Sequence, residues 1–262
     1  MNIRLYQIDA FTSRPFAGNP AGVCPLENWL DESVLRSIAI ETNQPATAFF
    51  VGKNGAFEIR WFTPSVELEL CGHGTMASSY VLFKILEPTR TSARFMCRSG
   101  PLDVSVNDSR PVLDFPALPL VRQHDPEIVA EALGAKPLEL WEADRAMALF
   151  ESERQIKELA PNIARVAALP YHSVIVTAPG ERGGGADFVS RFFAPKIGVP
   201  EDQVTGSSHC VLVPYWAKRL AKRNLFARQL SKRGGELWLE DHGARVHLSG
   251  DCVVISNGML SI

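Results

Sequence analysis

The chain has 262 residues, 46% of them hydrophobic, which suffices for a substantial buried core and slightly favours two domains over one. Its 27 basic and 29 acidic residues give a formal net charge of −2 at pH 7, and charges of one sign form no long run. This balance argues against a nucleic-acid or anionic-membrane surface, since both need concentrated positive charge.

The start of the sequence and its cysteines bear on where the protein resides. After Met1 the sequence opens directly with strand-like residues, without the pattern of a signal peptide, and no apolar run is long enough to cross a bilayer. The five cysteines are odd in number and scattered, which does not favour a disulfide framework. We therefore expect a cytoplasmic protein with no membrane partner.

The first half is predicted to be rich in strands. Asn54-Gly55 predicts a tight hairpin turn, because this pair adopts the positive φ angles that such turns need. In chain order, the predicted elements are a strand at 3–11, a turn-prone stretch at 13–20, a helix at 31–42, strands at 46–51 and 56–63, a helix with the buried stripe Met76, Tyr80 and Phe83, and strands at 93–97, 102–106 and 111–115.

The second half follows a predicted Pro-containing linker at 115–119. Its predicted elements are helices at 125–133 and 153–159, a buried strand at 171–177, a loop at 179–185, a strand at 188–193, a helix after Gly206, and strands at 236–239, 244–248 and 252–255. Because strands and helices do not alternate regularly, the pattern predicts an α+β fold of two similar halves, 1–116 and 117–262, with mostly antiparallel strands and a cleft between them. The last strand, around 253–255, could belong to either half.

One pattern occurs twice. Leu68–Phe83 and Asp202–Ala217 align without a gap, and in both a small Gly-rich turn opens an apolar segment with helical spacing. The first N–H groups of such a helix have no acceptor within it and lie at the positive end of its dipole. Two such ends facing each other across a cleft would hold a carboxylate through the amides of Gly72–Gly74 and Gly206–Ser208.

Several motifs occur in a fixed order: Asp9-Ala10-Phe11-Thr12, Gly18-Asn19-Pro20, Glu41-Thr42-Asn43, Cys71-Gly72-His73-Gly74-Thr75, Glu201-Asp202 and Thr205-Gly206-Ser207. Over essentially the whole chain they resemble the PhzF family of phenazine-biosynthesis-like isomerases, whose fold is shared with diaminopimelate epimerase. The resemblance implies two pseudo-symmetric domains, each a sheet wrapped around a central helix, and an active-site cleft between them. It also implies a homodimer, no organic cofactor, and general acid/base transfer of a proton between two carbons of a small carboxylated metabolite.

The resemblance also implies roles for individual residues. Glu41 is the candidate proton carrier, because a carboxylate beside apolar surface has a raised pKa; an idle, exposed helix-end Glu is the alternative. His73 could donate to the substrate carboxylate or keep Glu41 protonated. Asp202 and Ser207 match catalytic-site positions of the second half, where Asp202 could accept from a substrate amine or hydroxyl and Ser207 could bind the carboxylate; helix capping explains them equally well. Asn19 resembles a position that closes over the substrate, and turn chemistry is its alternative.

The chain also departs from related patterns. Cys71 stands where diaminopimelate epimerase has its first catalytic cysteine, but the partner position in the repeat is Thr205, so two-thiol racemisation is not favoured. Cys71 is then a second candidate base or a small buried residue at the helix start. Gln44-Pro45-Ala46 stands where relatives often carry Ser and Glu. Pro214 should kink the second helix or mark a late start.

Two other functions remain open. The protein could be an amino-acid epimerase or racemase that uses Glu41 or Cys71, or a non-catalytic metabolite-binding or interaction module. A zinc site is not favoured, because Cys71, His73 and the adjacent His209 and Cys210 lack the usual ligand spacing. No Walker loop and no dinucleotide fingerprint is present. We therefore expect no metal, no cofactor and no nucleic-acid partner.

Overall fold

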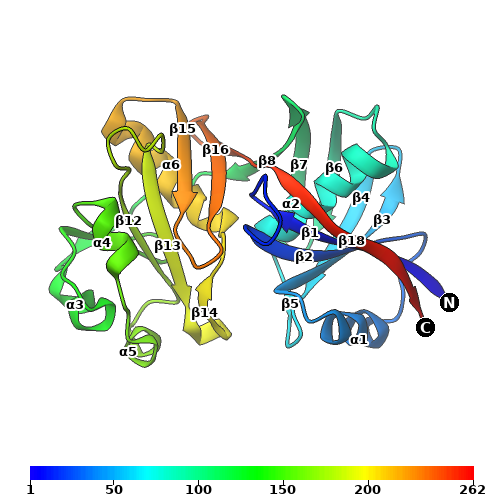
Figure 1. Ribbon diagram of the computed structural model, residues 1–262, viewed down its shortest axis with the longest axis horizontal. Coiled ribbons are helices and arrows are strands. Elements are labelled where there is room, and N and C mark those ends of the chain that lie inside the picture. Colours follow the sequence, from blue (N-terminus) through cyan, green and yellow to red (C-terminus); the bar gives the residue numbers. More distant parts are fainter. The chain divides into compact units, whose positions relative to one another are not determined.

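The computed structural model describes all 262 residues, which divide into two compact units (Figure 1). Unit 1 consists of Met1–Phe115 together with His247–Ile262, and unit 2 of Pro116–Val246. The chain returns to unit 1 within the strand β17 (Arg245–Ser249). No helix of the structure combines the length and the apolar character needed to cross a lipid bilayer.

Unit 1 is built mainly of strands. Its elements are β1 (Asn2–Ala10), β2 (Asn19–Leu26), α1 (Glu32–Thr42), β3 (Ala46–Lys53), β4 (Ala56–Phe62), β5 (Glu67–Leu68), α2 (Gly72–Val81), the π-helical turn η1 (Leu82–Leu86), β6 (Ser92–Cys97), β7 (Gly100–Asn107), β8 (Arg110–Pro116) and β18 (Cys252–Ser261).

Unit 2 has a similar content. Its elements are β9 (Arg122–His124), α3 (Glu127–Leu133), β10 (Glu139–Glu142), β11 (Ala146–Leu149), α4 (Glu153–Glu158), α5 (Ile163–Ala168), β12 (Val174–Pro179), β13 (Phe188–Ala194), the 3₁₀ turn η2 (Pro195–Ile197), β14 (Val199–Asp202), α6 (Gly206–Leu220), β15 (Asn224–Gln229) and β16 (Gly235–Asp241).

The two units repeat one order of strand pairings. In unit 1 the order is β18-β1-β2-β3-β4-β6-β7-β8, and only β2–β3 and β4–β6 are parallel. In unit 2 the order is β9-β10-β11-β12-β13-β15-β16, and the parallel pairs β11–β12 and β13–β15 occupy the same places. The short strands β5 and β14 pair antiparallel with β4 and β13. The predicted pseudo-symmetric, mostly antiparallel α+β fold is confirmed.

Each unit has one central helix. In unit 1, α2 packs against β1, β2 and β3 and is buried on nearly all sides (Figure 1). Its buried Ser and Thr side chains are tolerated there because each donates to a carbonyl four residues earlier: Thr75 to Cys71, Ser78 to Gly74, and Ser79 to Thr75, at 2.7 to 2.8 Å. In unit 2, α6 packs against β15 and β16.

The hairpin between β3 and β4 has the predicted turn. Lys53 pairs with Ala56, so that Asn54 and Gly55 form a two-residue loop. Their φ angles of 56° and 84° are the positive values that this turn requires. The local sequence signal was sufficient here because the turn chemistry does not depend on distant contacts.

Other strands were not anticipated. Residues Asn19 and Pro20, predicted to lie in a turn, begin β2, which pairs with both β1 and β3. The strands β10, β11 and β15 were also missed. Because β11 is buried on both faces, its sequence Ala146–Leu149 shows no alternation of apolar and polar residues.

The helix α6 runs through Pro214 without a late start, so that alternative is wrong. A proline removes the N–H that would bond to the carbonyl four residues earlier, here Cys210. The backbone N–H of Leu118 donates to that carbonyl instead, at 2.9 Å. A segment just after β8 thus supplies the hydrogen bond that the helix sequence cannot.

Candidate functional site

In unit 1 the candidate site lies at the first turn of α2. Cys71 is the N-cap residue, in an extended conformation with φ −141° and ψ 102°, and its side chain is buried. Its Sγ lies 3.6 Å from Nδ1 and 3.9 Å from Nε2 of His73, which is half-buried. The structure therefore brings a thiol and an imidazole together at the positive end of a helix.

Gly74, on the same turn, is required by close packing. A Cβ at this position would lie 2.7 Å from Cδ1 of Trp61 and 3.0 Å from Sγ of Cys71. The buried indole N–H of Trp61 has no hydrogen-bond partner. The absence of a side chain at Gly74 thus lets the start of α2 lie directly against β4.

Asn19 is the first residue of β2, directly after the connection from β1. Gly18 has a φ of +65°, and a Cβ there would lie 2.2 Å from the carbonyl oxygen of Ala10, so only glycine fits. The buried carboxylate of Asp9 accepts the N–H of Phe16 at 2.8 Å and fixes the connection. Asn19 itself is fully buried and pairs with Ala10 in the β1–β2 ladder.

Glu41 lies at the end of α1. It is an exposed residue in the last turn of α1, and it lines a groove formed with Ser37 and the end of β18 around Ser261. Neither Cys71 nor His73 lines this groove. The groove also contains the apolar side chains of Val34, Ile38 and Leu260, but Glu41 itself is exposed. Its catalytic role stays a prediction.

In unit 2 the candidate site lies at the first turn of α6. Thr205 is the N-cap residue, with φ −112° and ψ 101°, so neither Asp202 nor Ser207 occupies the N-cap position. The Thr205 hydroxyl donates to Oδ2 of Asp202 at 2.7 Å. Gln229 accepts the Thr205 N–H at 2.9 Å and donates to the Asp202 carbonyl at 2.9 Å. These bonds fix Asp202 beside the start of α6.

The next residues of α6 differ in what they face. Ser207 is half-buried, and its Oγ accepts a hydrogen bond from Nη1 of Arg145 at 3.0 Å. Ser208 is buried and donates to the carbonyl of Thr205 at 2.8 Å. Nδ1 of the fully buried His209 lies 2.8 Å from the same carbonyl, and burial lowers the pKa of His209 to about 4. Ser207 is thus the one of these side chains that is available to a ligand.

The candidate sites at the starts of α2 and α6, here called the half-sites of unit 1 and unit 2, share a local geometry. Cys71 and Thr205, which the internal alignment pairs, are both extended N-cap residues followed by a glycine at the first helical position. The carbonyl of each accepts a side-chain bond from the residue four positions later, Thr75 in α2 and His209 in α6. The sequence repeat therefore corresponds to a structural repeat.

Two further residues belong to the half-site of unit 2. Arg145 lies in the turn between β10 and β11, and Gln229 ends β15. Sequence reasoning missed both because these strands were not predicted. A buried glutamine and a charged pair, Asp144-Arg145, between apolar segments were the only local signals.

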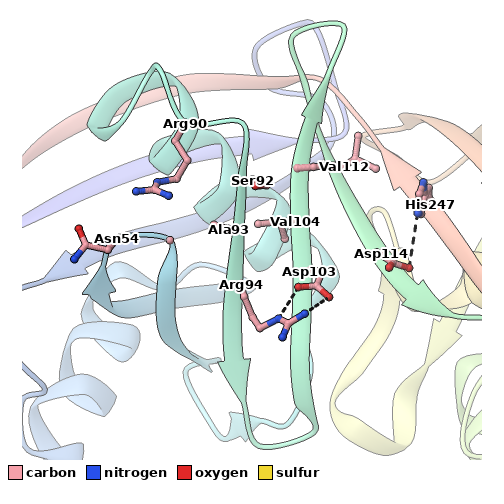
Figure 2. Close-up of a pocket in the computed structure, with 12 residues that line it drawn as sticks. Asn54, Arg90, Ser92, Ala93, Arg94, Asp103, Val104, Val112, Asp114 and His247 are labelled. Atoms are coloured by element: carbon pink, nitrogen blue, oxygen red, sulfur yellow. Dashed lines mark hydrogen bonds and ion pairs between the residues drawn. The ribbon is translucent and has the colours of Figure 1, made fainter.

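Another pocket of unit 1, of about 500 Å³, contains none of the predicted site residues (Figure 2). Figure 2 shows two charged pairs in its wall: Arg94 donates to both oxygens of Asp103 at 2.7 and 2.9 Å, and His247 lies 3.9 Å from Asp114. The third cation of the wall, Arg90, is paired with Glu87, which does not line the pocket. Because these charged side chains are already paired, we assign no catalytic or binding role to this pocket.

Comparison with known proteins gives consistent results. A family model described as "Phenazine biosynthesis-like protein" matches residues 8–258. An uncharacterized isomerase of Pseudomonas aeruginosa is 47% identical, and the match covers 100% of each chain. A PhzF family protein of Enterococcus faecalis has a solved structure with a TM-score of 0.94 and 39% identity, again over 100% of each chain.

A structure with much lower sequence identity is similar to this chain in fold alone. The hydroxyproline epimerase of Agrobacterium vitis, solved with trans-4-hydroxy-L-proline bound, has a TM-score of 0.61 at 11% identity. The likeness covers 99% of this chain and 92% of that one.

Proposed function

Because the chain belongs to the PhzF family of phenazine biosynthesis-like proteins, we propose that it is an isomerase that moves a proton between two carbon atoms of a small carboxylated metabolite. The observation that carries this proposal is the pair formed by Cys71 and His73, with the thiol 3.6 Å from the imidazole at the start of α2. A thiol and an imidazole at this distance can exchange a proton, as general acid/base chemistry at carbon requires.

The substrate carboxylate is expected to bind at the helix starts. The amides of Gly72 to Gly74 and of Gly206 to Ser208 belong to first turns, where N–H groups have no acceptor within the helix and the dipole favours a negative charge. When a proton leaves the carbon next to this carboxylate, negative charge spreads onto the carboxylate oxygens. The same N–H donors stabilise that charge, so they make the C–H bond more acidic. Binding and activation thus use one set of groups.

Two side chains compete for the role of base. Glu41 is exposed and lies in the groove beside β18. Cys71 is buried next to His73 at the positive end of α2. We propose that the Cys71–His73 pair transfers the proton and that Glu41 does not.

Deuterium exchange tests this proposal. The protein is incubated in D₂O with but-3-enoate, the simplest carboxylate with a β,γ double bond, and with L-proline, and the products are analysed by mass spectrometry and NMR. An isomerase removes the proton at C2 of but-3-enoate and delivers deuterium at C4 as the double bond moves. We expect exchange to be lost in Cys71→Ser and reduced in His73→Asn, and to be retained in Glu41→Gln.

The other outcomes assign other functions. Exchange lost in Glu41→Gln but kept in Cys71→Ser would give the role of base to Glu41. Deuterium at the α-carbon of L-proline with loss of optical activity would identify an epimerase or racemase, an alternative that the Cys71–His73 pair also supports. Carboxylates that bind without exchange would identify a non-catalytic binding module.

A further inference from the structure

The guanidinium of Arg145 is fixed beside the start of α6. Its Nη1 donates to Oγ of Ser207 at 3.0 Å, and its Nε donates to Oδ1 of Asp144 at 2.8 Å. Its carbon Cζ lies 5.5 Å from the centre of the Phe192 ring, a cation–π contact. Phe192 is the strand partner of Asp202, so the guanidinium lies among the site residues of unit 2.

The donors of this guanidinium are only partly used. A guanidinium has five N–H groups. Asp144 receives bonds from Nε and Nη2, and Ser207 receives one from Nη1, which leaves one N–H on each terminal nitrogen. The Arg145 side chain is only 13% exposed, whereas that of Asp144 is 40% exposed. A mostly buried cation is therefore balanced by a carboxylate that solvent can reach.

We propose that Arg145 binds the substrate carboxylate beside Ser207, and that Asp144 competes with the substrate for the same guanidinium. The proposal rests on the proposed function, since it assigns the carboxylate of that substrate a charged partner. A planar guanidinium matches a carboxylate with two parallel hydrogen bonds, which an ammonium cannot do. The ligand class that follows is a small monocarboxylate, and an uncharged amide of the same shape should be rejected.

The competition predicts effects of opposite sign at neighbouring residues. Arg145→Gln removes the cation and should weaken carboxylate binding about ten-fold or more, the usual effect of losing a charge-assisted hydrogen bond. Asp144→Asn removes the competing carboxylate and should tighten binding. If the Asp144–Arg145 pair were purely structural, both substitutions would change carboxylate affinity in the same direction, because each breaks the same contact.

Binding is measured by NMR titration of the full-length protein with but-3-enoate and L-proline, and with but-3-enamide and L-prolinamide as uncharged counterparts. We expect Kd for the acids to rise in Arg145→Gln, to rise less in Arg145→Lys, and to fall in Asp144→Asn, with little change for the amides. Arg154→Gln on α4 is the matched control, because it removes the same charge from a side chain that is 79% exposed. Thermal melting confirms that each variant is folded.

Equal shifts of Kd in Arg145→Gln and Asp144→Asn, or equal effects on acids and amides, would overturn this inference. Deuterium exchange on the same variants separates it from the proposed function. Exchange by the wild type with a KM that Arg145→Gln leaves unchanged would overturn the role of Arg145 alone. Arg145-dependent binding without exchange would support the role of Arg145 and overturn the isomerase. A wild type that binds no carboxylate would overturn both.

Discussion

His209 shows how a single side chain can bear on stability without taking part in the site chemistry. Its ring is fully buried in α6, with Nδ1 bonded to the Thr205 carbonyl and Nε2 without a partner. The ring centre lies 6.0 Å from that of Phe188. Burial therefore disfavours the protonated form and lowers the pKa to about 4 from an ordinary value of 6.5.

This pKa shift predicts a pH-dependent stability. Between about pH 6.5 and pH 4 the unfolded chain binds a proton at His209 that the folded protein does not, so stability falls as the pH is lowered through this window. The shift corresponds to about 3 kcal/mol. We expect His209→Gln to flatten the pH dependence of the urea unfolding midpoint over this range. His172→Gln, at an exposed histidine, is the matched control and should retain it; equal slopes in all three proteins would contradict the prediction.

At the scale of the element, α6 depends on a hydrogen bond from outside the helix. Pro214 leaves the buried Cys210 carbonyl without its usual donor, and Leu118 supplies one at 2.9 Å. Leu118 is part of the segment that follows β8, which the sequence identified as a linker. The linker is thus part of the packing of α6 rather than a free connection.

A double-mutant cycle tests this dependence. Leu118→Pro removes the N–H and should lower the free energy of unfolding by about 1–3 kcal/mol, because a buried carbonyl loses its donor. In the Pro214→Ala background the new N–H of residue 214 can donate to the same carbonyl, so the cost of Leu118→Pro should be smaller. Chemical denaturation of the four proteins measures the coupling. Equal costs in both backgrounds would show that the Leu118 bond does not replace the one lost at Pro214.

At the scale of the whole molecule, unit 1 is completed by the end of the chain. The strand β18 pairs with β1 from Asn2 opposite Ser261 to Ala10 opposite Cys252. Without β18, β1 would present an unpaired edge. Unit 2 is one continuous segment, Pro116–Val246, and it encloses its own buried cluster around Leu140, Val176 and Phe193.

Fragments should therefore fold differently. We expect residues 116–246 to fold alone, and residues 1–115 to require β18. Because Ile262 N–H bonds to the Met1 carbonyl at 2.9 Å, residues 247–262 can be joined by a short glycine linker to residues 1–115. Circular dichroism melting should be cooperative for this permuted fragment and not for 1–115. Cooperative melting of 1–115 alone would show that β18 is dispensable.

The sequence by itself determined the features that depend on local chemistry. Asn54-Gly55 specified the β3–β4 turn, and the repeated Gly-rich segments specified two helices, whose N-caps the structure places at Cys71 and Thr205. The motifs also indicated the family, and the irregular order of elements indicated an α+β fold. The turn and the two helix starts follow from backbone preferences of short segments, which operate before distant parts of the chain meet. The family follows from the resemblance of the motifs.

Only the tertiary structure decided the features that depend on contacts distant in sequence. It identified β11, whose two buried faces remove the alternation by which strands are predicted, and it paired β18 with β1. It also brought Arg145 to Ser207, 62 positions later, and left Glu41 exposed in a separate groove. Burial and partners of a side chain are set by the assembled fold, and the pKa and reactivity of a candidate residue follow from them.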